Sequence, residues 1–240
     1  MIHYFLVLVF LVPWTAIGIV LVILGKLVNP SGRLAHIFGR NWAWGILTAS
    51  RVKLEIEGTE NIDPDGQYIF ISNHTSAFDI PGMYWGLKNK LGMLAKKQLQ
   101  YVPLFGWAMW AAGHFFVDRK NHKKALAVMD QVAVQLAEDR THSLVIFVEG
   151  TRSPDGQLSR FKKGAFVLSQ QTKIPIVPVV INGAFKAKSK KGNRIVATTI
   201  KLSILPPMDP LKYDSSSRQQ YVDDARALFV EHYDAPPKSV

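Results

Sequence analysis

Cysteine is absent from this sequence of 240 residues. Its absence excludes disulfide bonds, thiolate nucleophiles and cysteine-ligated metals. Acidic residues are scarce: 18 Asp and Glu stand against 29 Lys and Arg, which gives a formal net charge of +11. This excess of positive charge indicates an anionic partner, and nucleic acid, a membrane surface and a phosphorylated substrate all meet that description. Composition alone does not choose among the three.

The beginning of the chain has no charged residue from Tyr4 to Gly25 and no carboxylate before Glu55. As a helix the uncharged run would reach ~33 Å, about the thickness of the hydrocarbon core of a bilayer. Pro13 and Gly18 lie within it, so the sequence leaves open whether the segment is straight or kinked. No Lys or Arg precedes the run and no small-residue cleavage pattern follows it, which argues against a cleaved signal peptide.

A basic segment with tryptophans follows the uncharged run. It carries Lys26, Arg33 and Arg40 among apolar residues that include Trp42 and Trp44. This pattern is typical of a helix that lies among anionic headgroups. Residues 1–50 are therefore predicted to form a membrane anchor, and the positive residues after the run predict that the remainder lies on the cytoplasmic side. The alternative is a buried N-terminal helical hairpin in a soluble protein.

After residue 50 the pattern becomes that of an α/β domain. Short apolar or alternating runs predict strands at Val52–Glu57, Tyr68–Ser72, Leu91–Ala95, His114–Val117, Ser143–Val148, Ile176–Ile181 and Arg194–Leu205. Helical spacing predicts helices at Leu99–Ala112, Asn121–Asp139, Phe161–Gln171 and Arg218–Tyr233. The alternation predicts an α/β fold with a mainly parallel central sheet flanked by helices. Residues 51–240 are expected to form this domain, without an internal repeat.

The strand at Tyr68–Ser72 leads directly into His74, and functional groups gather where strands of an open α/β sheet end. Asp79 follows five residues later, a spacing that neither a helix nor a strand brings together, so the pair meets only if the chain wraps. An aspartate bonded to the imidazole would fix its tautomer and make the other ring nitrogen a general base. In the alternative, Asp79 only caps a helix that starts near Pro81.

A second polar turn follows the strand predicted at Ser143–Val148. It contains Glu149, Gly150, Thr151 and Arg152. Gly150 permits a tight backbone and the close approach of a ligand, and Arg152 offers a planar set of donors suited to phosphate. Taken alone, this segment is better explained as an ordinary turn.

Two cationic residues, Lys96 and Arg119, each come at or just after the end of a predicted strand. A cation at a strand end beside a histidine loop suits a substrate that bears phosphate. The lysines between positions 186 and 191 form a polar loop instead, and we expect them to contact anionic lipid or to be solvated.

Four blocks of this sequence occur in the order typical of one family. They are Asn-His-Thr-Ser-Ala-Phe-Asp at 73–79, Gly-His-Phe-Phe-Val-Asp-Arg at 113–119, Phe-Val-Glu-Gly-Thr-Arg-Ser at 147–153 and Ile-Pro-Ile-Val-Pro-Val-Val at 174–180. With its H-x4-D and E-G-T-R motifs, the chain resembles the glycerolipid acyltransferases, most of all those that acylate lysophosphatidate. Thr-Ser-Ala-Phe within the first block departs from the pattern of many members, and residues 182–240 carry no motif.

The resemblance implies that His74, oriented by Asp79, removes the proton from the sn-2 hydroxyl of lysophosphatidate. That oxygen would then attack the thioester of acyl-CoA or acyl-carrier protein directly, giving phosphatidic acid without a cofactor or a metal. The resemblance assigns binding of the acceptor phosphate and shaping of the site to Lys96, Arg119, Glu149, Gly150, Thr151 and Arg152. It also implies anionic membrane lipids as partners and the inner membrane of a bacterium as the location.

Two other classes of protein fit part of the pattern. A nucleic-acid-binding module would explain the net charge of +11, but it would not explain a bilayer-length apolar run. A non-catalytic protein of the membrane surface would explain the anchor and the charge, but it would leave the pair of His74 and Asp79 without a role. Within the enzyme class, the alternative is acylation of another lyso-lipid.

Overall fold

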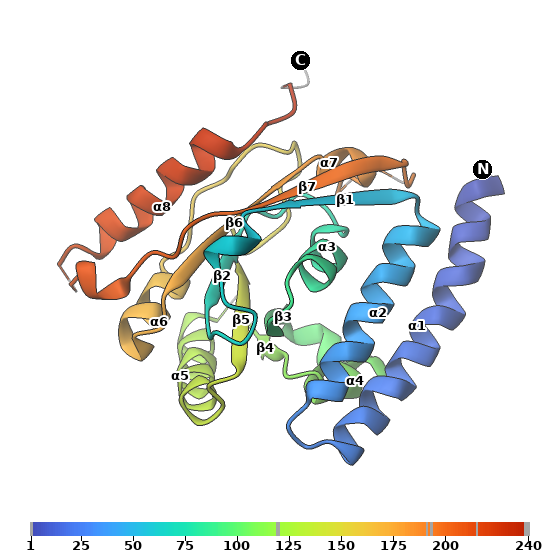
Figure 1. Cartoon of the computed structure of the whole chain (residues 1–240), viewed down its shortest axis with the longest axis horizontal. Helices are drawn as coiled ribbons and strands as arrows, with labels where there is room; N and C mark the ends of the chain where they lie inside the picture. The colour runs from blue at the N-terminus through green and yellow to red at the C-terminus, as the bar shows by residue number, and fades with distance from the viewer. Residues whose placement is uncertain (1, 119–120, 191, 193, 215, 238–240) are drawn as a thin grey trace.

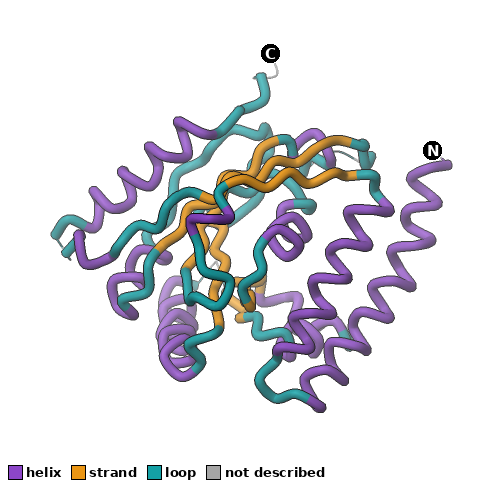
Figure 2. The backbone as a smooth tube through the Cα atoms, in the orientation of Figure 1, coloured by secondary structure: helices purple, strands orange, loops and turns teal. Residues whose placement is uncertain are grey.

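A computed structural model describes residues 2–118, 121–190, 192, 194–214 and 216–237 of the chain (Figure 1). Two long helices come first, and a central sheet with helices on both faces follows them. Figure 2 shows how the two N-terminal helices lie side by side along one flank of the sheet domain. This arrangement confirms the predicted α/β class.

The first helix, α1, covers Ile2–Val28 and stays unbroken through Pro13. The second, α2, covers Arg33–Ala49 and packs along α1. The two helices are joined by the indole of Trp14, whose Nε1 donates to the carbonyl of Trp42 over 3.1 Å. Gly45 makes this approach possible, since a Cβ there would meet the Trp14 ring at 2.2 Å. The short turn between the helices therefore closes an antiparallel hairpin.

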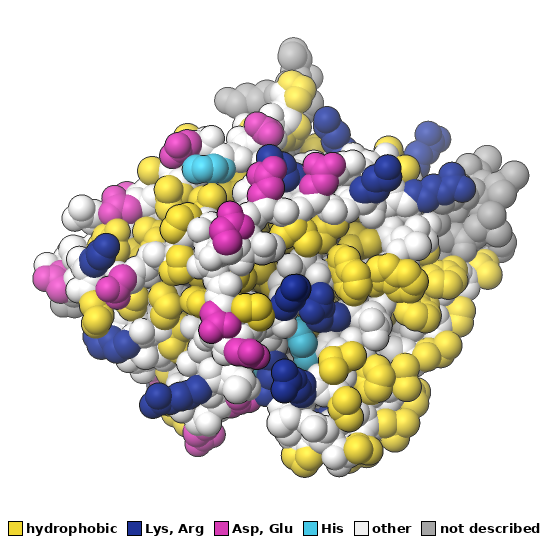
Figure 3. Space-filling model, viewed as in Figure 1, with side chains coloured by type: hydrophobic (Ala, Val, Ile, Leu, Met, Phe, Trp, Pro, Cys, Tyr) yellow, Lys and Arg dark blue, Asp and Glu magenta, His cyan; other side chains and the backbone are white. Residues whose placement is uncertain are grey.

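The outer side of α1 is apolar and exposed. Within the described residues, α1 is the one helix that is long and apolar enough to cross a membrane, over Val9–Val28, and only 17% of that window is buried. Hydrophobic side chains gather over the flank that α1 occupies (Figure 3). The expected boundary at residue 50 stays a prediction, because α2 also packs against the sheet domain through Ala43 and Leu47.

The sheet has seven strands in the order β1-β7-β6-β2-β5-β3-β4. All neighbouring pairs are parallel except β6 and β7, which are antiparallel. The parallel pairing confirms the expectation of a mainly parallel sheet. The strands cover Val52–Glu57 (β1), Ile69–Ser72 (β2), Lys90–Lys96 (β3), Phe115–Val117 (β4), His142–Phe147 (β5), Ile176–Asn182 (β6) and Thr198–Ile204 (β7).

Two apolar cores lie on the two faces of the sheet. One lies under α5, α6 and α8 and the other lies under α2, α3 and α7. Strand β6 is buried along its whole length, as expected of a central strand that faces both cores. These helices cover Asp79–Gly86 (α3), Phe105–Ala111 (α4), His122–Glu138 (α5), Gly164–Thr172 (α6), Ala184–Ala187 (α7) and Arg218–His232 (α8), and short 3-10 helices cover Thr59–Asn61, Lys97–Tyr101 and Pro210–Lys212.

Strand β7 is shorter than the predicted strand at Arg194–Leu205. It begins at Thr198, where its parallel neighbour β1 also begins at Val52. Residues before Thr198 have no strand beside them, so their alternating pattern finds no ladder to join. Elsewhere the predicted strands agree with the observed ones to within one residue.

Candidate active site

The loop after β2 brings together His74 and Asp79. The Nδ1 atom of His74 lies 2.7 Å from Oδ2 of Asp79. The same Oδ2 atom accepts hydrogen bonds from the backbone amides of Thr75 over 2.7 Å and Ser76 over 2.8 Å. The chain therefore wraps around the carboxylate, which is the arrangement that the five-residue spacing requires.

Asp79 does not act as a helix cap. It is the first residue of α3, the N-cap position belongs to Phe78, and no side chain caps the helix. Its carboxylate instead points back toward the preceding loop and is fully buried, whereas the His74 side chain keeps 12% of its surface exposed. Because a carboxylate can only accept, Nδ1 of His74 carries the proton and the other ring nitrogen, Nε2, is left with a free electron pair.

The imidazole of His74 is held in place from several sides. Its ring stacks on Phe147 at the end of β5, with 4.0 Å between ring centroids and 16° between the planes. Just before it, the amide side chain of Asn73 donates to the carbonyl of Ile181 and accepts from the amide of the same residue. The histidine is thus presented from a rigid strand end, which favours a catalytic role.

Glu149 joins the two polar loops. Its carboxylate is buried and accepts from the backbone amide of His74 over 2.9 Å and from that of Ser159 over 2.8 Å. A second link between the loops is the bond from the Ser153 amide to the His74 carbonyl, over 2.7 Å. Both carboxylate oxygens of Glu149 therefore accept hydrogen bonds from backbone amides, and the side chain holds the two polar loops together.

The turn at Gly150 exposes Thr151 and keeps Arg152 partly exposed. Gly150 has a φ of 72°, which is in the left-handed region, and the Nζ atom of Lys162 lies only 2.7 Å from where its Cβ would be. The backbone of Arg152 is held by Lys190, whose Nζ donates to its carbonyl over 3.0 Å. Two lysines that sequence reasoning left outside the site thus lie against the Glu-Gly-Thr-Arg turn.

Lys96 lies at the same edge of the sheet, at the exposed end of β3. Since β5 separates β3 from β2, the ends of these two strands are about 10 Å apart. Arg119, the other cation predicted at a strand end, lies outside the described residues. The structure thus brings together His74, Asp79 and the turn at 149–152, with Lys96 farther along the edge.

Tyr233, directly after α8, is a site residue that sequence reasoning missed. Its hydroxyl donates to the carbonyl of Gly156 over 2.6 Å and lies near the Thr75 side chain. Burial raises the pKa of Tyr233, and the charges of Asp79 and Glu149 raise it further, so the phenol stays protonated. No local signal could have found it, because this contact joins segments 77 residues apart.

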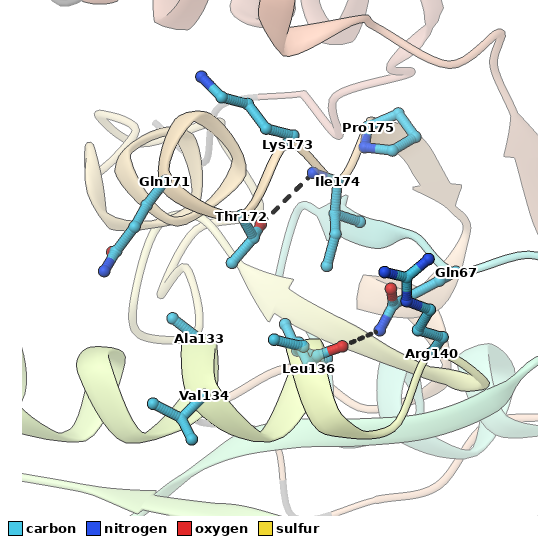
Figure 4. A pocket seen from close by; sticks show the side chains of 11 residues that line it. Gln67, Ala133, Val134, Leu136, Arg140, Gln171, Thr172, Lys173, Ile174 and Pro175 are labelled. Atoms are coloured by element: carbon cyan, nitrogen blue, oxygen red, sulfur yellow. Dashed lines mark hydrogen bonds between the residues drawn. The ribbon is translucent and has the colours of Figure 1, made fainter.

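A cavity of about 600 Å³ lies at the other edge of the sheet (Figure 4). Its wall includes Arg140, the end of α5 and the turn after α6, where Ile174 donates its amide to the Thr172 hydroxyl. Gln67, just before β2, also lines it. Because β2 runs from this cavity toward His74, the cavity is separate from the catalytic edge. Within the described ranges, no group of three or more His, Cys, Asp or Glu side chains is placed to hold a metal.

A family model described as Acyltransferase matches residues 53–182, a range that contains both polar loops. A 1-acyl-sn-glycerol-3-phosphate acyltransferase of Limnanthes alba is 30% identical over 233 residues, which are 97% of this chain and 77% of that protein. The human 1-acyl-sn-glycerol-3-phosphate acyltransferase alpha is 34% identical over 157 residues, or 65% of this chain and 55% of that protein. The chain belongs to the acyltransferase family, as its motifs predicted.

The chain spans little more than half the length of the mammalian relatives it matches, namely 55% of the human protein and 54% of the bovine one. Among solved structures, the 1-acyl-sn-glycerophosphate acyltransferase PlsC from Thermotoga maritima has a TM-score of 0.77 and 24% sequence identity. That match covers 96% of this chain and 95% of the other. It shows that the two chains share a fold.

Proposed function

We propose that this protein transfers a fatty acyl group from a thioester donor to the sn-2 hydroxyl of lysophosphatidate, which gives phosphatidic acid. The observation that carries the proposal is the bond of 2.7 Å between His74 Nδ1 and the buried Asp79 carboxylate, in the loop that follows β2. The names of the relatives, which are 1-acyl-sn-glycerol-3-phosphate acyltransferases, support the choice of acceptor.

In the proposed reaction, Nε2 of His74 takes the proton of the acceptor hydroxyl as its oxygen attacks the thioester carbonyl. A tetrahedral intermediate forms, and we assign its oxyanion to backbone amides of the turn at 149–152 other than that of Gly150, which already donates to the carbonyl of Phe147. The carbon–sulfur bond then breaks, and the imidazolium returns the proton to the leaving thiolate. Asp79 keeps the imidazole in the required tautomer and stabilises its charged form. An oxygen ester and a free thiol result, and His74 regains its starting state.

We assign the acceptor phosphate to cations around the site. Arg152 is partly exposed on the turn next to His74, and Lys96 is exposed at the end of β3. Arg119 completes the set proposed from the sequence. A phosphate monoester has three oxygens, so a planar guanidinium and a flexible ammonium can share it. Lys162, next to Gly150, is a further cation within reach of this turn.

The donor is a thioester of coenzyme A or of acyl-carrier protein, and we propose that no further cofactor takes part. Both substrates would meet the enzyme at a membrane that contains anionic lipids, where α1 anchors the chain. That this membrane is the inner membrane of a bacterium, with the catalytic domain on its cytoplasmic side, stays a prediction.

An acceptor panel tests the proposal. Purified protein receives one labelled acyl donor and, separately, lysophosphatidate, glycerol 3-phosphate or lysophosphatidylcholine. We expect transfer to lysophosphatidate only. Transfer to lysophosphatidylcholine would replace the proposed acceptor by a complete lysophospholipid, and transfer to none of the three would contradict the proposed function. The His74→Ala variant is the matched control for a contaminating activity.

A further inference from the structure

Helix α4 buries small side chains and exposes large aromatic ones, which is the reverse of what is expected for a helix that faces water. It buries its alanines, with Ala108 at 6% and Ala111 at 5% exposure, while Trp107 is 63% and Trp110 is 69% exposed. Burial in a core removes far more apolar surface from water for tryptophan than for alanine. If this face of α4 lay in water, we would expect the tryptophans to be buried and the alanines to be exposed. The exposed face of α4 is therefore suited to an apolar environment.

The segment before α4 continues the same face. Tyr101 is 69% exposed, Val102 is 44% exposed and Leu104 is 52% exposed. Leu104 also has a φ of 62°, a strained conformation for a residue with a side chain. We call residues 101–110 the aromatic ridge. Strain held at an exposed leucine is typical of a segment that is retained for function.

The aromatic ridge is continuous with the exposed side of α1. Ala108 and Ala111 pack against Val22 of α1, so the tryptophans stand beside that helix. Between the two helices lies an apolar groove of about 270 Å³, walled by Trp107, Trp110 and residues near the end of α1. The end of α1 adds Leu24 at 50% exposure and Leu27 at 73% to the same surface. A contiguous apolar surface of this kind marks an interaction site.

We propose that the aromatic ridge is a second membrane contact, built into the α/β domain and separate from the anchor helix. Its occupant is the boundary between headgroups and acyl chains of a phospholipid bilayer. Tryptophan and tyrosine concentrate at that depth because one part of each ring system is apolar and the other forms hydrogen bonds. Continuity with α1, which is long and apolar enough to enter a bilayer, favours a lipid surface over a second copy of the chain.

A contact at this place would fix the orientation of the whole domain. The aromatic ridge begins five residues after Lys96, the last residue of β3. An attachment through the N-terminal helices alone would leave the tilt of the whole molecule relative to the bilayer unfixed. Two attachments hold the end of β3, and with it the edge of the sheet that carries His74, at a constant height above the lipid. This inference does not depend on the identity of the acyl acceptor.

The absence of cysteine allows a direct test by site-directed spin labelling. Single variants Trp107→Cys and Trp110→Cys of the full chain are labelled with a nitroxide and placed in vesicles of phosphatidylethanolamine and phosphatidylglycerol. Accessibility to oxygen and to a water-soluble nickel chelate then reports the depth of each label. Leu24→Cys on α1 is the lipid-facing reference, and Leu211→Cys, at a side chain that is 70% exposed and far along the chain, is the water-facing reference.

We expect the ratio of oxygen to nickel accessibility at positions 107 and 110 to exceed that at position 211 several-fold and to approach that at position 24. A ratio equal to that at position 211 would overturn the proposal. Strong dipolar broadening between labels of different molecules would also overturn it, in favour of a second copy as the occupant. Tyr101→Cys, which leaves both tryptophans in place, repeats the measurement if replacement of a tryptophan itself disturbs the contact.

Discussion

Histidines lie both at the carboxyl ends of the strands, here called the carboxyl edge, and at their amino ends, here called the amino edge. The hydrogen-bond partners of these histidines differ between the two ends. At the carboxyl edge, His74 donates Nδ1–H to a buried carboxylate and keeps part of its ring exposed. At the amino edge, the Nδ1 atom of His114 instead accepts from the amide of Met93 over 3.1 Å, and its Nε2 atom lies 2.9 Å from the Tyr84 hydroxyl. An imidazole in that position is complete as a neutral molecule.

Two further histidines, His36 and His142, are buried near His114. Burial lowers the pKa of His36 to about 4, that of His114 to about 3 and that of His142 to about 4. The charge of Lys90 lowers the pKa of His36 and His142 further, and Asp139 opposes this only for His142. We call these three histidines the amino-edge cluster.

The comparison shows that residue type alone does not make a catalytic base. The amino-edge cluster has burial and amide donors, which favour the uncharged ring. In His74, Nδ1 is bonded to the carboxylate of Asp79 and Nε2 carries a free electron pair, so the ring can accept a proton and return it. Histidine therefore contributes to the stability of the fold as a neutral ring at the amino edge, and it is placed for proton transfer at the carboxyl edge.

The largest expected effect is the loss of the carboxylate behind His74. Asp79→Asn keeps the shape of the side chain, but an amide that turns its NH2 group toward Nδ1 selects the wrong tautomer of the ring. We expect kcat to fall about 10⁴-fold, or about 5 kcal/mol, as expected of a dyad of this type. Measured turnover within tenfold of the unsubstituted protein would mean that Asp79 serves only the fold of the loop.

The next largest effect is a loss of stability at low pH. The histidines of the amino-edge cluster take up protons when the chain unfolds in acid, so a lower pH favours the unfolded state. The folded pKa values are about 4, 3 and 4, below the ordinary value of 6.5. The stability that depends on neutral imidazoles is thus complete above pH 6.5 and is lost as pH falls toward 4. Several kcal/mol of unfolding free energy should disappear over this window. Denaturant titrations at a series of pH values measure it, and a flat profile would contradict the neutral cluster.

Removal of one member of the amino-edge cluster should reduce this dependence. His142→Ala deletes a ring whose Nε2 has no hydrogen-bond partner in the described structure. Between pH 6.5 and 4 we expect the slope of stability against pH to fall by as much as about 1.4 kcal/mol per pH unit, the value for one proton. A slope in His142→Ala equal to that of the unsubstituted protein would contradict a role for His142 in the acid sensitivity of the fold.

The smallest expected effect concerns the support of the catalytic edge. Tyr233→Phe removes the hydroxyl that donates to the carbonyl of Gly156, and with it a support of the loop that follows the Glu-Gly-Thr-Arg turn. We expect kcat to fall about fivefold, or about 1 kcal/mol, with little change in KM. The control is Tyr213→Phe, which removes a hydroxyl that donates to Asp224 away from the site. Equal rates in the two variants would show that Tyr233 has no positioning role.

Much of the site was predictable because its parts are local in sequence. His74 and Asp79 lie in one loop, and the Glu-Gly-Thr-Arg turn follows one apolar strand. The parallel orientation of β2 and β5 then places both loops at one edge. The wrap around the Asp79 carboxylate was required by the spacing, although the amides of Thr75 and Ser76 that complete it were not foreseen.

The rest depends on contacts between distant segments, which leave no local pattern. Tyr233 has no motif around it, and Lys162 reaches Gly150 only because the loop between them folds back. The antiparallel pairing of β7 with β6 and its late start at Thr198 also follow from its neighbours β1 and β6. Arg194–Leu205 alternates along its length, but only the part with partners becomes a strand.

The placement of Tyr233 has a consequence for the order of synthesis. Because a chain is made from its N-terminal side, α1 is synthesised long before Tyr233, and β7, the partner of β1, comes shortly before Tyr233. The helix that is long and apolar enough to enter a bilayer is therefore available long before the loop at Gly156 has its final support from Tyr233. For the proposed function, this order means that a nascent chain can reach a lipid surface before its candidate active site is complete.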